Sequence, residues 1–501
     1  MKTRNVFLLL LIMVLSLCLV GCGAQGPQGT KGDWIPTGPQ GEYDMNSESF
    51  VNSEAFLELQ ETGYINTETN SKLNVSLDSS TAAYSNIRKN IVNNYNIHKD
   101  SVNIEQMLNY FNYSYSNKSD EQLQSFLEIA DCPWNDNKLL SVAIKAKDYQ
   151  LENVKPNNFV FLLDVSGSMN ANNKLPLMIE AFKLLIDNLN ENDRVSIVTY
   201  AGSDNVLLDG GFGYEKTKIS AIISDLYAYG STAGSKGITT AYKLASKYYI
   251  EGGNNRVFLA TDGDFNVGLS STQELEKFIS EKRETGVYLS LFGFGSGNLK
   301  SDIMDTLAQA GNGNYYYIDS ILEAQKIFIS ELGGTLETVA KDCKVQIEFN
   351  KDIISKYRII GYENKILTDE EFENSETDAG EIGAGHTTVC LVEVVLKEDY
   401  ELKEALTKCI LKYKDVKDNE IERTIVNELK EIASNPSNDF IFQSAIAEFG
   451  LLLRNSQFKD NANYNNLISR IENDNVLNDI YRKEFLELVK LARDKYSTNI
   501  D

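Results

Sequence analysis

The sequence predicts an α/β protein in which a parallel sheet carries helices on both faces, joined to a β-rich flanking region and a helical C-terminal region. Three observations support this prediction. Apolar strand-length runs alternate with amphipathic helical segments over residues 158–335, period-two patterns flank that region on both sides, and helical spacing returns near residue 416. With 501 residues, 42% of them hydrophobic, the chain is long enough for about three domains.

Residues 1–21 have the pattern of a bacterial lipoprotein signal peptide. Basic residues at positions 2 and 4 precede an apolar run over 6–20, which is shorter than the ~20 residues of a membrane-spanning helix. Leu19-Val20-Gly21-Cys22 resembles a lipobox, in which cleavage leaves Cys22 to carry a diacylglyceryl group. An ordinary secretory signal with an incidental cysteine is the alternative. Residues 22–72 are polar and aperiodic after a short glycine repeat and predict a flexible tether.

Residues 73–157 form an N-terminal flanking region of mixed character. A short strand is expected at 74–78, with helices at 81–92 and 104–111. Near residue 140, Leu140, Val142 and Ile144 alternate with polar residues, which predicts a half-buried strand.

Residues 158–335 carry the alternation of strands and helices that predicts the parallel sheet. Strands are expected at 159–164, 194–200, 256–261, 287–293 and 315–318. Helices are expected to begin near residues 175, 217, 237, 272 and 300. Apolar spacing of three and four residues, clear in the first of these helices, predicts faces that pack on the sheet.

The remaining chain divides into a β-rich region, 336–415, and a helical region, 416–501. Alternation over 343–349 predicts one strand, and the apolar run 389–396 predicts a second, more buried one. Helices are expected at 421–432, 440–453 and 482–496, with Asn435-Pro436 separating the first two. The strands on either side of 158–335 are too few to close separate cores, so we expect them to form one domain into which the α/β domain is inserted.

Composition excludes several classes of function. The chain has 48 Lys and Arg against 72 Asp and Glu, a net charge of −24, which disfavours nucleic-acid binding. Only 2 histidines occur, which makes a His-rich zinc site or a Ser-His-Asp triad improbable. Four cysteines follow Cys22, and they are as compatible with buried thiols as with two disulfides in any of three connectivities.

A set of oxygen-bearing side chains follows the expected strands at one edge of the sheet. Asp164, Ser166 and Ser168 form an Asp-x-Ser-x-Ser motif directly after the first strand of the α/β region. Thr232 lies in a glycine-containing loop before a helix, and Asp262 follows the strand 256–261. Oxygen donors of this kind suit Mg²⁺ or another divalent cation, and ligand sites of open α/β sheets lie at this edge. Taken alone, the first motif also fits a helix N-cap and an Asx turn.

The three segments, in this order, resemble the metal-ion-dependent adhesion site of the von Willebrand factor type A (VWA) domain. The resemblance implies that Ser166, Ser168 and Thr232 bind the metal through hydroxyls and that Asp164 and Asp262 bind it directly or through water. Further strings resemble a group of bacterial VWA-containing lipoproteins with characteristic flanking regions. They lie at 107–111, 132–135, 174–177, 199–202, 261–268, 361–364, 378–386 and 449–454.

The resemblance and the signal peptide imply a protein anchored by lipid at the outer face of the bacterial membrane or cell envelope. The leading hypothesis is an adhesion-type protein that recognises a protein, or another acidic ligand, at the metal's vacant position, where an acidic side chain of a partner could bind. The alternative is a structural or assembly subunit in which the metal only stabilises the fold. An enzyme is disfavoured, because no general base accompanies the motif except its own ligands. We also expect the ligand side chains to face a solvent-exposed edge.

Overall fold

The computed structural model describes residues 56, 58–77, 80–148, 155–230, 235–263, 271–296, 300–331, 337–473 and 475–496. All of them belong to one compact unit, residues 51–501. The predicted signal peptide, Cys22 and most of the tether lie outside the described residues, as does Thr232. The prediction of a flexible tether up to residue 72 is wrong for its last part, because residues 65–66 form a strand paired with β12 (Ile354–Ile360) and Thr67 is buried.

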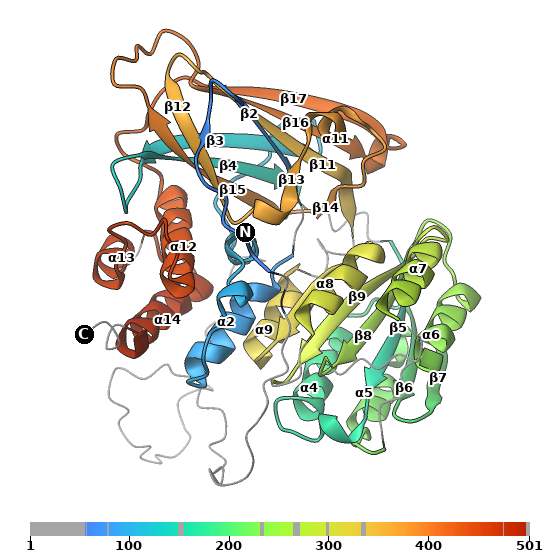
Figure 1. Cartoon of the computed structure of the whole chain (residues 1–501). Coiled ribbons are helices and arrows are strands. Elements are labelled where there is room, and N and C mark those ends of the chain that lie inside the picture. Colours follow the sequence, from blue (N-terminus) through green and yellow to red (C-terminus); the bar gives the residue numbers. More distant parts are fainter. Residues whose placement is uncertain are drawn as a thin grey trace, which may run out of the picture. The chain divides into compact units, whose positions relative to one another are not determined.

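A six-stranded sheet forms the centre of the α/β domain (Figure 1), with strand order β10-β9-β8-β5-β6-β7. Its strands are β5 (Asn157–Asp164), β6 (Arg194–Tyr200), β7 (Asp204–Phe212), β8 (Asn254–Thr261), β9 (Val287–Phe294) and β10 (Tyr315–Ile318). The five predicted strands are present and parallel. The sheet is mixed rather than wholly parallel, because β7, which was not expected, pairs antiparallel with β6 at the edge.

Helices cover both faces of this sheet, as the apolar spacing predicts. They are α4 (Leu175–Asp187), α5 (Lys216–Ser224), α6 (Ser235–Lys247), α7 (Thr272–Arg283), α8 (Ser301–Ala310) and α9 (Ile321–Gln325), which continues as a π-helical segment (Lys326–Glu331). One core packs α4, α5 and α9 on the sheet, and a second packs α6, α7 and α8 on the opposite face. Every residue of β5 and β8 is buried, as expected for central strands covered on both faces.

The β-rich part is a sandwich of two antiparallel sheets. One has the order β1-β12-β15-β4-β3, and the other has the order β13-β2-β11-β16-β17, with β14 paired to β11. The strands are β1 (Ile65–Asn66), β2 (Lys72–Ser76), β3 (Leu123–Asp131), β4 (Lys138–Ala146), β11 (Thr338–Phe349), β12 (Ile354–Ile360), β13 (Ile366–Leu367), β14 (Gly380–Gly383), β15 (Thr387–Leu396), β16 (Thr407–Asp415) and β17 (Ile421–Leu429). A shared apolar core joins the two sheets. A short helix, α11 (Asp369–Glu373), lies beside β2 and β11.

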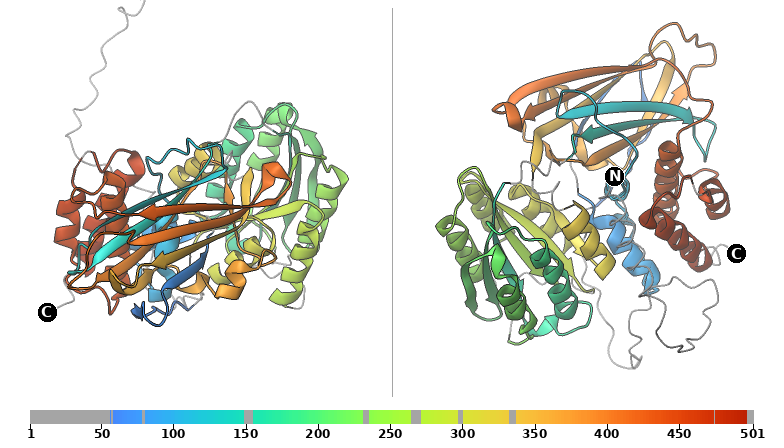
Figure 2. Two further views of the ribbon diagram at one scale, coloured as in Figure 1. Left: turned by 90° about the horizontal axis from the view of Figure 1, so that it is seen from above. Right: turned by 180° about the vertical axis from the view of Figure 1, so that it is seen from behind.

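The expected insertion of the α/β domain into this sandwich is confirmed. Strand β4, before the insertion, pairs with β15, which follows it, and β2 likewise pairs with β11. In Figure 2 the teal strands β3 and β4 accordingly lie with the orange strands from the second half of the chain. Both halves of the sequence are therefore needed to complete either sheet.

Helices from both chain ends pack on the outer face of the β4-containing sheet. They are α2 (Ala82–Val92), α3 (Ile104–Asn109), α12 (Asn438–Arg454), α13 (Tyr464–Ile471) and α14 (Ile480–Tyr496). Their apolar side chains share a core with Leu139, Ala143 and Leu391 of the sheet. The helical part begins at Asn438 rather than near residue 416, and the helix expected at 421–432 is wrong, because those residues form strand β17.

A buried arginine links the α/β domain to the helices. Arg88 of α2 pairs with Asp319 (2.5 Å) and Glu323 (2.7 Å) of the α/β domain and with Glu484 of α14 (3.0 Å). All three partners are carboxylates, and the arginine side chain is only 5% exposed. An ion pair with this little solvent contact is held in one geometry by the surrounding packing, so Arg88 fixes α2 against both neighbours.

Candidate functional site

The candidate site lies at the carboxyl ends of two neighbouring strands. Asp164 is the last residue of β5, and Asp262 follows Thr261, the last residue of β8. The two strands are parallel and adjacent, so their ends meet at one edge of the sheet. The structure therefore brings together the two carboxylates that the sequence placed in separate motifs.

Asp164 is fully buried and well supplied with hydrogen bonds. Its Oδ1 accepts from the backbone N–H of Ser166 at 2.9 Å, the Asx turn expected of this position, and its Oδ2 accepts from the Thr261 hydroxyl at 3.0 Å. Burial, with a smaller contribution from the charge of Asp262, raises the pKa of Asp164 to about 6, although the hydrogen bonds oppose the shift. A raised pKa means that the anion lacks sufficient compensating charge in this structure.

The two serines of the motif lie side by side. Their hydroxyl oxygens are 3.0 Å apart, with Ser166 buried and Ser168 exposed. The loop that leads to Thr232 is bonded to this motif: the Tyr229 N–H donates to the carbonyl of Val165, and the Gly167 N–H donates to that of Gly230. The hydroxyl-bearing loops are thus held next to each other up to residue 230.

Asp262 has a cationic partner that the sequence did not predict. The ammonium of Lys174 donates to Asp262 Oδ2 at 2.8 Å and to the backbone carbonyl of Ser168 at 3.0 Å. A signal for Lys174 was present in the sequence, because it directly precedes helix α4. Ser, Thr, Asp and Asn are preferred at that position, and a positive charge is unfavourable there.

The expectation that the ligand side chains face solvent is wrong for the carboxylates. Asp164 and Asp262 are both 0% exposed, and only Ser168 of the four described residues is exposed. The cause is the burial of β5 and β8 by helices on both faces, which extends to their last residues. A cation at this edge would rest on buried carboxylates and meet solvent on the Ser168 side.

The donor set fits a hard divalent cation. Two carboxylates and two hydroxyls lie at the carboxyl ends of the adjacent strands β5 and β8, and oxygen ligands of these kinds hold Mg²⁺ in proteins. The two carboxylates together carry one more negative charge than Lys174 offsets. No cluster of three or more His, Cys, Asp or Glu side chains able to hold a metal occurs among the residues that the structure describes.

The string at 378–386 lies elsewhere, at the junction of the α/β domain and the sandwich. It lines a polar cavity of about 620 Å³ together with residues of α7 and α8. Glu381 accepts hydrogen bonds there from Asn312 (2.7 Å) and Thr338 (3.2 Å), and burial raises its pKa to about 7. His386 lines the same cavity, apart from the Asp-x-Ser-x-Ser motif. Residues 378–386 therefore belong to the junction between the α/β domain and the sandwich and not to the metal motif.

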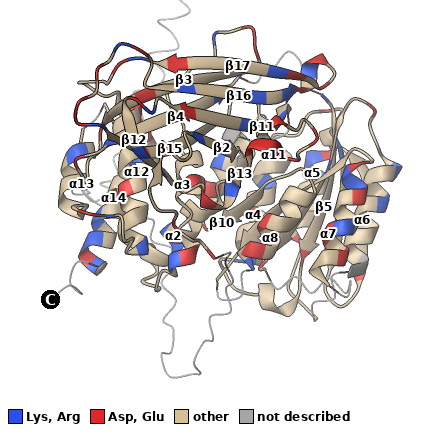
Figure 3. Ribbon diagram, turned by 45° about the horizontal axis from the view of Figure 1, so that its top comes forward, with Lys and Arg blue, Asp and Glu red and all other residues tan. Residues whose placement is uncertain are grey.

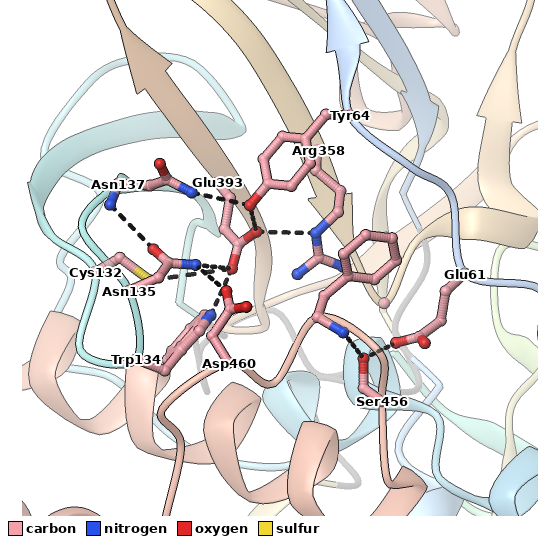
Figure 4. Close-up of polar contacts among 12 residues, drawn as sticks. Glu61, Tyr64, Cys132, Trp134, Asn135, Asn137, Arg358, Glu393, Ser456 and Asp460 are labelled. Atoms are coloured by element: carbon pink, nitrogen blue, oxygen red, sulfur yellow. Dashed lines mark hydrogen bonds and ion pairs between the residues drawn. The ribbon is translucent and has the colours of Figure 1, made fainter.

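The string at 132–135 belongs to a buried polar cluster centred on Glu393 (Figure 4). Glu393 pairs with Arg358 at 2.9 Å, both 0% exposed, and accepts hydrogen bonds from Trp134 Nε1 (2.5 Å) and Tyr64 Oη (2.5 Å). The Phe458 ring packs on the guanidinium. The cluster joins the N-terminal segment, the sandwich and the helical region, which indicates a structural role.

The four cysteines that follow Cys22 are buried free thiols. They are Cys132, Cys343, Cys390 and Cys409. Burial raises the pKa of each thiol above its ordinary value, which disfavours the reactive thiolate.

The described residues show how charged side chains are distributed and whether any helix could cross a membrane. In the view of Figure 3, Lys and Arg are interspersed with Asp and Glu along α7 and the sandwich strands, whereas the charged residues of α8 are acidic. Within the described residues, no helix combines the length and apolar character needed to cross a membrane.

Known families match three consecutive parts of the chain. Residues 158–329 match the family "von Willebrand factor type A domain", and residues 334–494 match "Uncharacterized protein YfbK, C-terminal". Residues 50–141 match a family described as "von Willebrand factor". The protein YfbK of Escherichia coli strain K12 is 38% identical over 448 residues, which cover 83% of this chain and 77% of that protein. The chain belongs to the YfbK family of VWA proteins.

More distant similarities concern parts of the chain. A Synechocystis protein, sll0103, is 28% identical over 200 residues, which cover 40% of this chain and 46% of that one. Among solved structures, a von Willebrand factor type A protein from Catenulispora acidiphila aligns with 67% of this chain and 81% of its own at a TM-score of 0.40 and 15% identity. Membership of the family gives the chain a domain of protein-interaction or adhesion type, and VWA domains commonly bind a divalent metal.

Proposed function

We propose that the protein is a lipid-anchored binding protein of the bacterial cell surface that recognises an acidic group of a partner protein through a divalent cation. The cation, Mg²⁺ in the first instance, is held by Asp164, Ser166, Ser168, Thr232 and Asp262. Bound there, it would supply an open coordination position for a carboxylate oxygen of the partner.

The observation that carries this proposal is the convergence of the two carboxylates at one sheet edge. Asp164 and Asp262 come from strands β5 and β8 and are both 0% exposed. Burying two like charges together is costly unless cations compensate them. In the metal-free structure Lys174 offsets one of the two charges, and a divalent cation bound to both carboxylates could offset both.

The site favours binding over turnover. Asp164 and Asp262 are needed as ligands, and the ammonium of Lys174 is already bonded to Asp262 and Ser168. Tyr200 also interacts with Asp164, but its phenol is fully buried and its pKa is raised well above the ordinary value, which makes it a poor general base. The chemistry available is polarising and holding a partner group.

The anchor rests on the N-terminal sequence. The lipobox-like string ends at Cys22, and the polar residues 23–55, which precede the folded part of the chain, would serve as the tether between the lipid and the domains. Mass spectrometry of the N-terminal peptide from cell membranes should find acylated Cys22. Replacing Cys22 with Ser should release the protein into the soluble fraction, and a retained Met1 on the membrane form would contradict the anchor.

The metal-dependent binding is tested with an isosteric variant. Asp164→Asn keeps the acceptor for the Ser166 N–H but removes the charge, so it should abolish Mg²⁺ binding in calorimetry and chelator-sensitive capture of partners from the cell surface. Asp225→Asn, at an exposed position after helix α5, is the matched control and should leave both unchanged.

Two outcomes would redirect the proposal. Partner capture that persists in EDTA, with the metal confirmed absent, would contradict metal-dependent recognition. Loss of the folded α/β domain on metal removal, without an effect specific to partner binding, would favour the structural or assembly role.

A further inference from the structure

Lys174 is placed where a helix does not favour a lysine. It immediately precedes α4, whose first turn contains no acidic residue to offset the charge. The N-terminal end of a helix carries a partial positive charge, so a lysine there is repelled unless another group binds it. The lysine head is therefore drawn away from α4 by a stronger partner.

The stem of Lys174 passes against a glycine of a different loop. Gly295, after strand β9, has a φ of +79°, and a Cβ at that position would lie 2.5 Å from both Cγ and Cε of Lys174. Any side chain at position 295 would collide with the extended lysine. The absence of a side chain at Gly295 thus leaves room for the Lys174 stem, which extends to Asp262 at the end of β8.

The head of Lys174 ends on atoms of the metal motif. Its Nζ lies 2.8 Å from Asp262 Oδ2 and 3.0 Å from the Ser168 carbonyl, and the side chain is 11% exposed. Both bonds are of good length, and Asp262 itself is 0% exposed. This ammonium therefore neutralises the charge of Asp262, and both groups have little contact with solvent.

A divalent cation and an ammonium repel each other and both seek the same carboxylate. Resting on the proposed function, we infer that Lys174 is a built-in cation of the metal site, which neutralises Asp262 in the metal-free protein and is displaced when a divalent cation binds. The domain can therefore stay folded without metal. The affinity for the metal is lower than it would be without Lys174, because breaking the bond between Lys174 and Asp262 reduces the net free energy of metal binding.

The test removes the charge and keeps the stem. Lys174→Met in the full chain should bind Mg²⁺ about tenfold or more tightly than wild type in calorimetry, since no competitor remains. Its melting temperature in EDTA should fall by several degrees below that of wild type, and Mg²⁺ should restore most of the loss. Lys183→Met is the control, because Lys183 forms a more exposed pair with Glu180 on the same helix. It should change neither measurement.

A second variant separates charge from packing. Lys174→Met combined with Asp262→Asn removes both charges, so its melting temperature in EDTA should return toward that of wild type if the unpaired Asp262 charge is the cause. A double variant as unstable as Lys174→Met, or a Lys174→Met protein as stable as wild type in EDTA, would overturn the inference.

The Mg²⁺ titration distinguishes this inference from the proposed function. Equal affinity of wild type and Lys174→Met would overturn displacement while leaving metal-dependent recognition intact. If the Lys174→Met protein binds Mg²⁺ and the wild type does not, the inference is supported, but the proposal that the wild type recognises its partner through Mg²⁺ is contradicted. Absence of Mg²⁺ binding in both proteins would overturn the displacement and the metal-dependent function together.

Discussion

Replacing Glu393 with Gln removes the counter-charge of a guanidinium that has no contact with solvent. Arg358 and Glu393 are both 0% exposed, and the Nη1 and Nη2 atoms of Arg358 have no hydrogen-bond partner in the structure. The Arg358 side chain therefore depends on Glu393 for its compensation. An amide at position 393 would present its NH₂ group to donors, or leave one donor unsatisfied.

The expected loss is large. Breaking a buried ion pair by removing one partner costs about 3–5 kcal/mol, because the remaining charge stays buried. Stability of a domain is about 5–15 kcal/mol, so the change should be visible as a shifted denaturation midpoint. Replacing Arg358 and Glu393 together with Met removes the unpaired charge but leaves the Trp134 Nε1–H without its acceptor, so it should recover only part of the loss.

Tryptophan fluorescence reports on this cluster directly. The chain has 2 tryptophans, and Trp134 is bonded to Glu393. In a Trp34→Phe background, urea denaturation followed by fluorescence therefore reports the unfolding of the region around Trp134. Glu401→Gln, which removes an exposed pair with Lys403, is the control and should change the free energy of unfolding by less than about 0.5 kcal/mol. A loss below about 1 kcal/mol for Glu393→Gln would refute the reasoning.

Three further predictions follow from the described residues. Because the pKa of Glu381 is raised to about 7, the folded chain binds this proton more tightly than the unfolded chain, and the free energy of unfolding falls as pH rises from about 4.5 to about 7. Glu381→Gln should reduce the corresponding fall in melting temperature. An unchanged dependence of melting temperature on pH would contradict the raised pKa. Gly313→Ala places a Cβ 1.8 Å from the Leu289 carbonyl oxygen and should lower the melting temperature strongly, whereas Gly63→Ala, with nothing within 4 Å, should not. The four buried cysteines should resist iodoacetamide until the protein unfolds, and peptide mapping that finds one labelled in the native state would contradict their burial.

The elements predicted best were those with two buried faces or a full amphipathic face. Strands β5 and β8 are apolar runs between turns, and α4 shows helical spacing along its whole length, so local pattern and tertiary burial agree. The metal motif was predicted at Asp164, Ser166, Ser168 and Asp262 because oxygen donors follow those strands. The structure brings the first three together in one loop and places Asp262 at the neighbouring strand end.

Edge strands were the elements that local pattern predicted poorly. In β17, alternate residues from Arg423 to Leu429 face inward, but only Ile425 and Leu429 among them are apolar. Their four-residue spacing also fits a helix, and only pairing with β16 distinguishes the two. Strand β7 was missed for a related reason, since Val206 and Leu207 are exposed at the sheet edge and break the alternation.

Lys174 was missed because its partner is distant in sequence. Lys174 and Asp262 lie 88 positions apart, and no spacing rule connects a residue before one helix to the end of a different strand. The burial of Asp164 was also not predicted. The sequence places this residue at the end of a strand but does not show that helices cover both faces of the sheet there. Contacts of this kind follow from the packed tertiary structure.

The interleaved strands of the sandwich have a consequence for biosynthesis. Asn74 of β2 bonds to Gln346 of β11, 272 positions further along the chain. Because the chain is made, and would also be exported, from its N-terminus, β2, β3 and β4 emerge long before β11 and β15, whereas the inserted domain has all of its own strands before β11 emerges. The α/β domain can thus complete its fold first and bring the distant strands toward each other. Until translation has passed β15, the early strands expose unpaired edges, so the nascent chain is most vulnerable to aggregation and proteolysis during that interval.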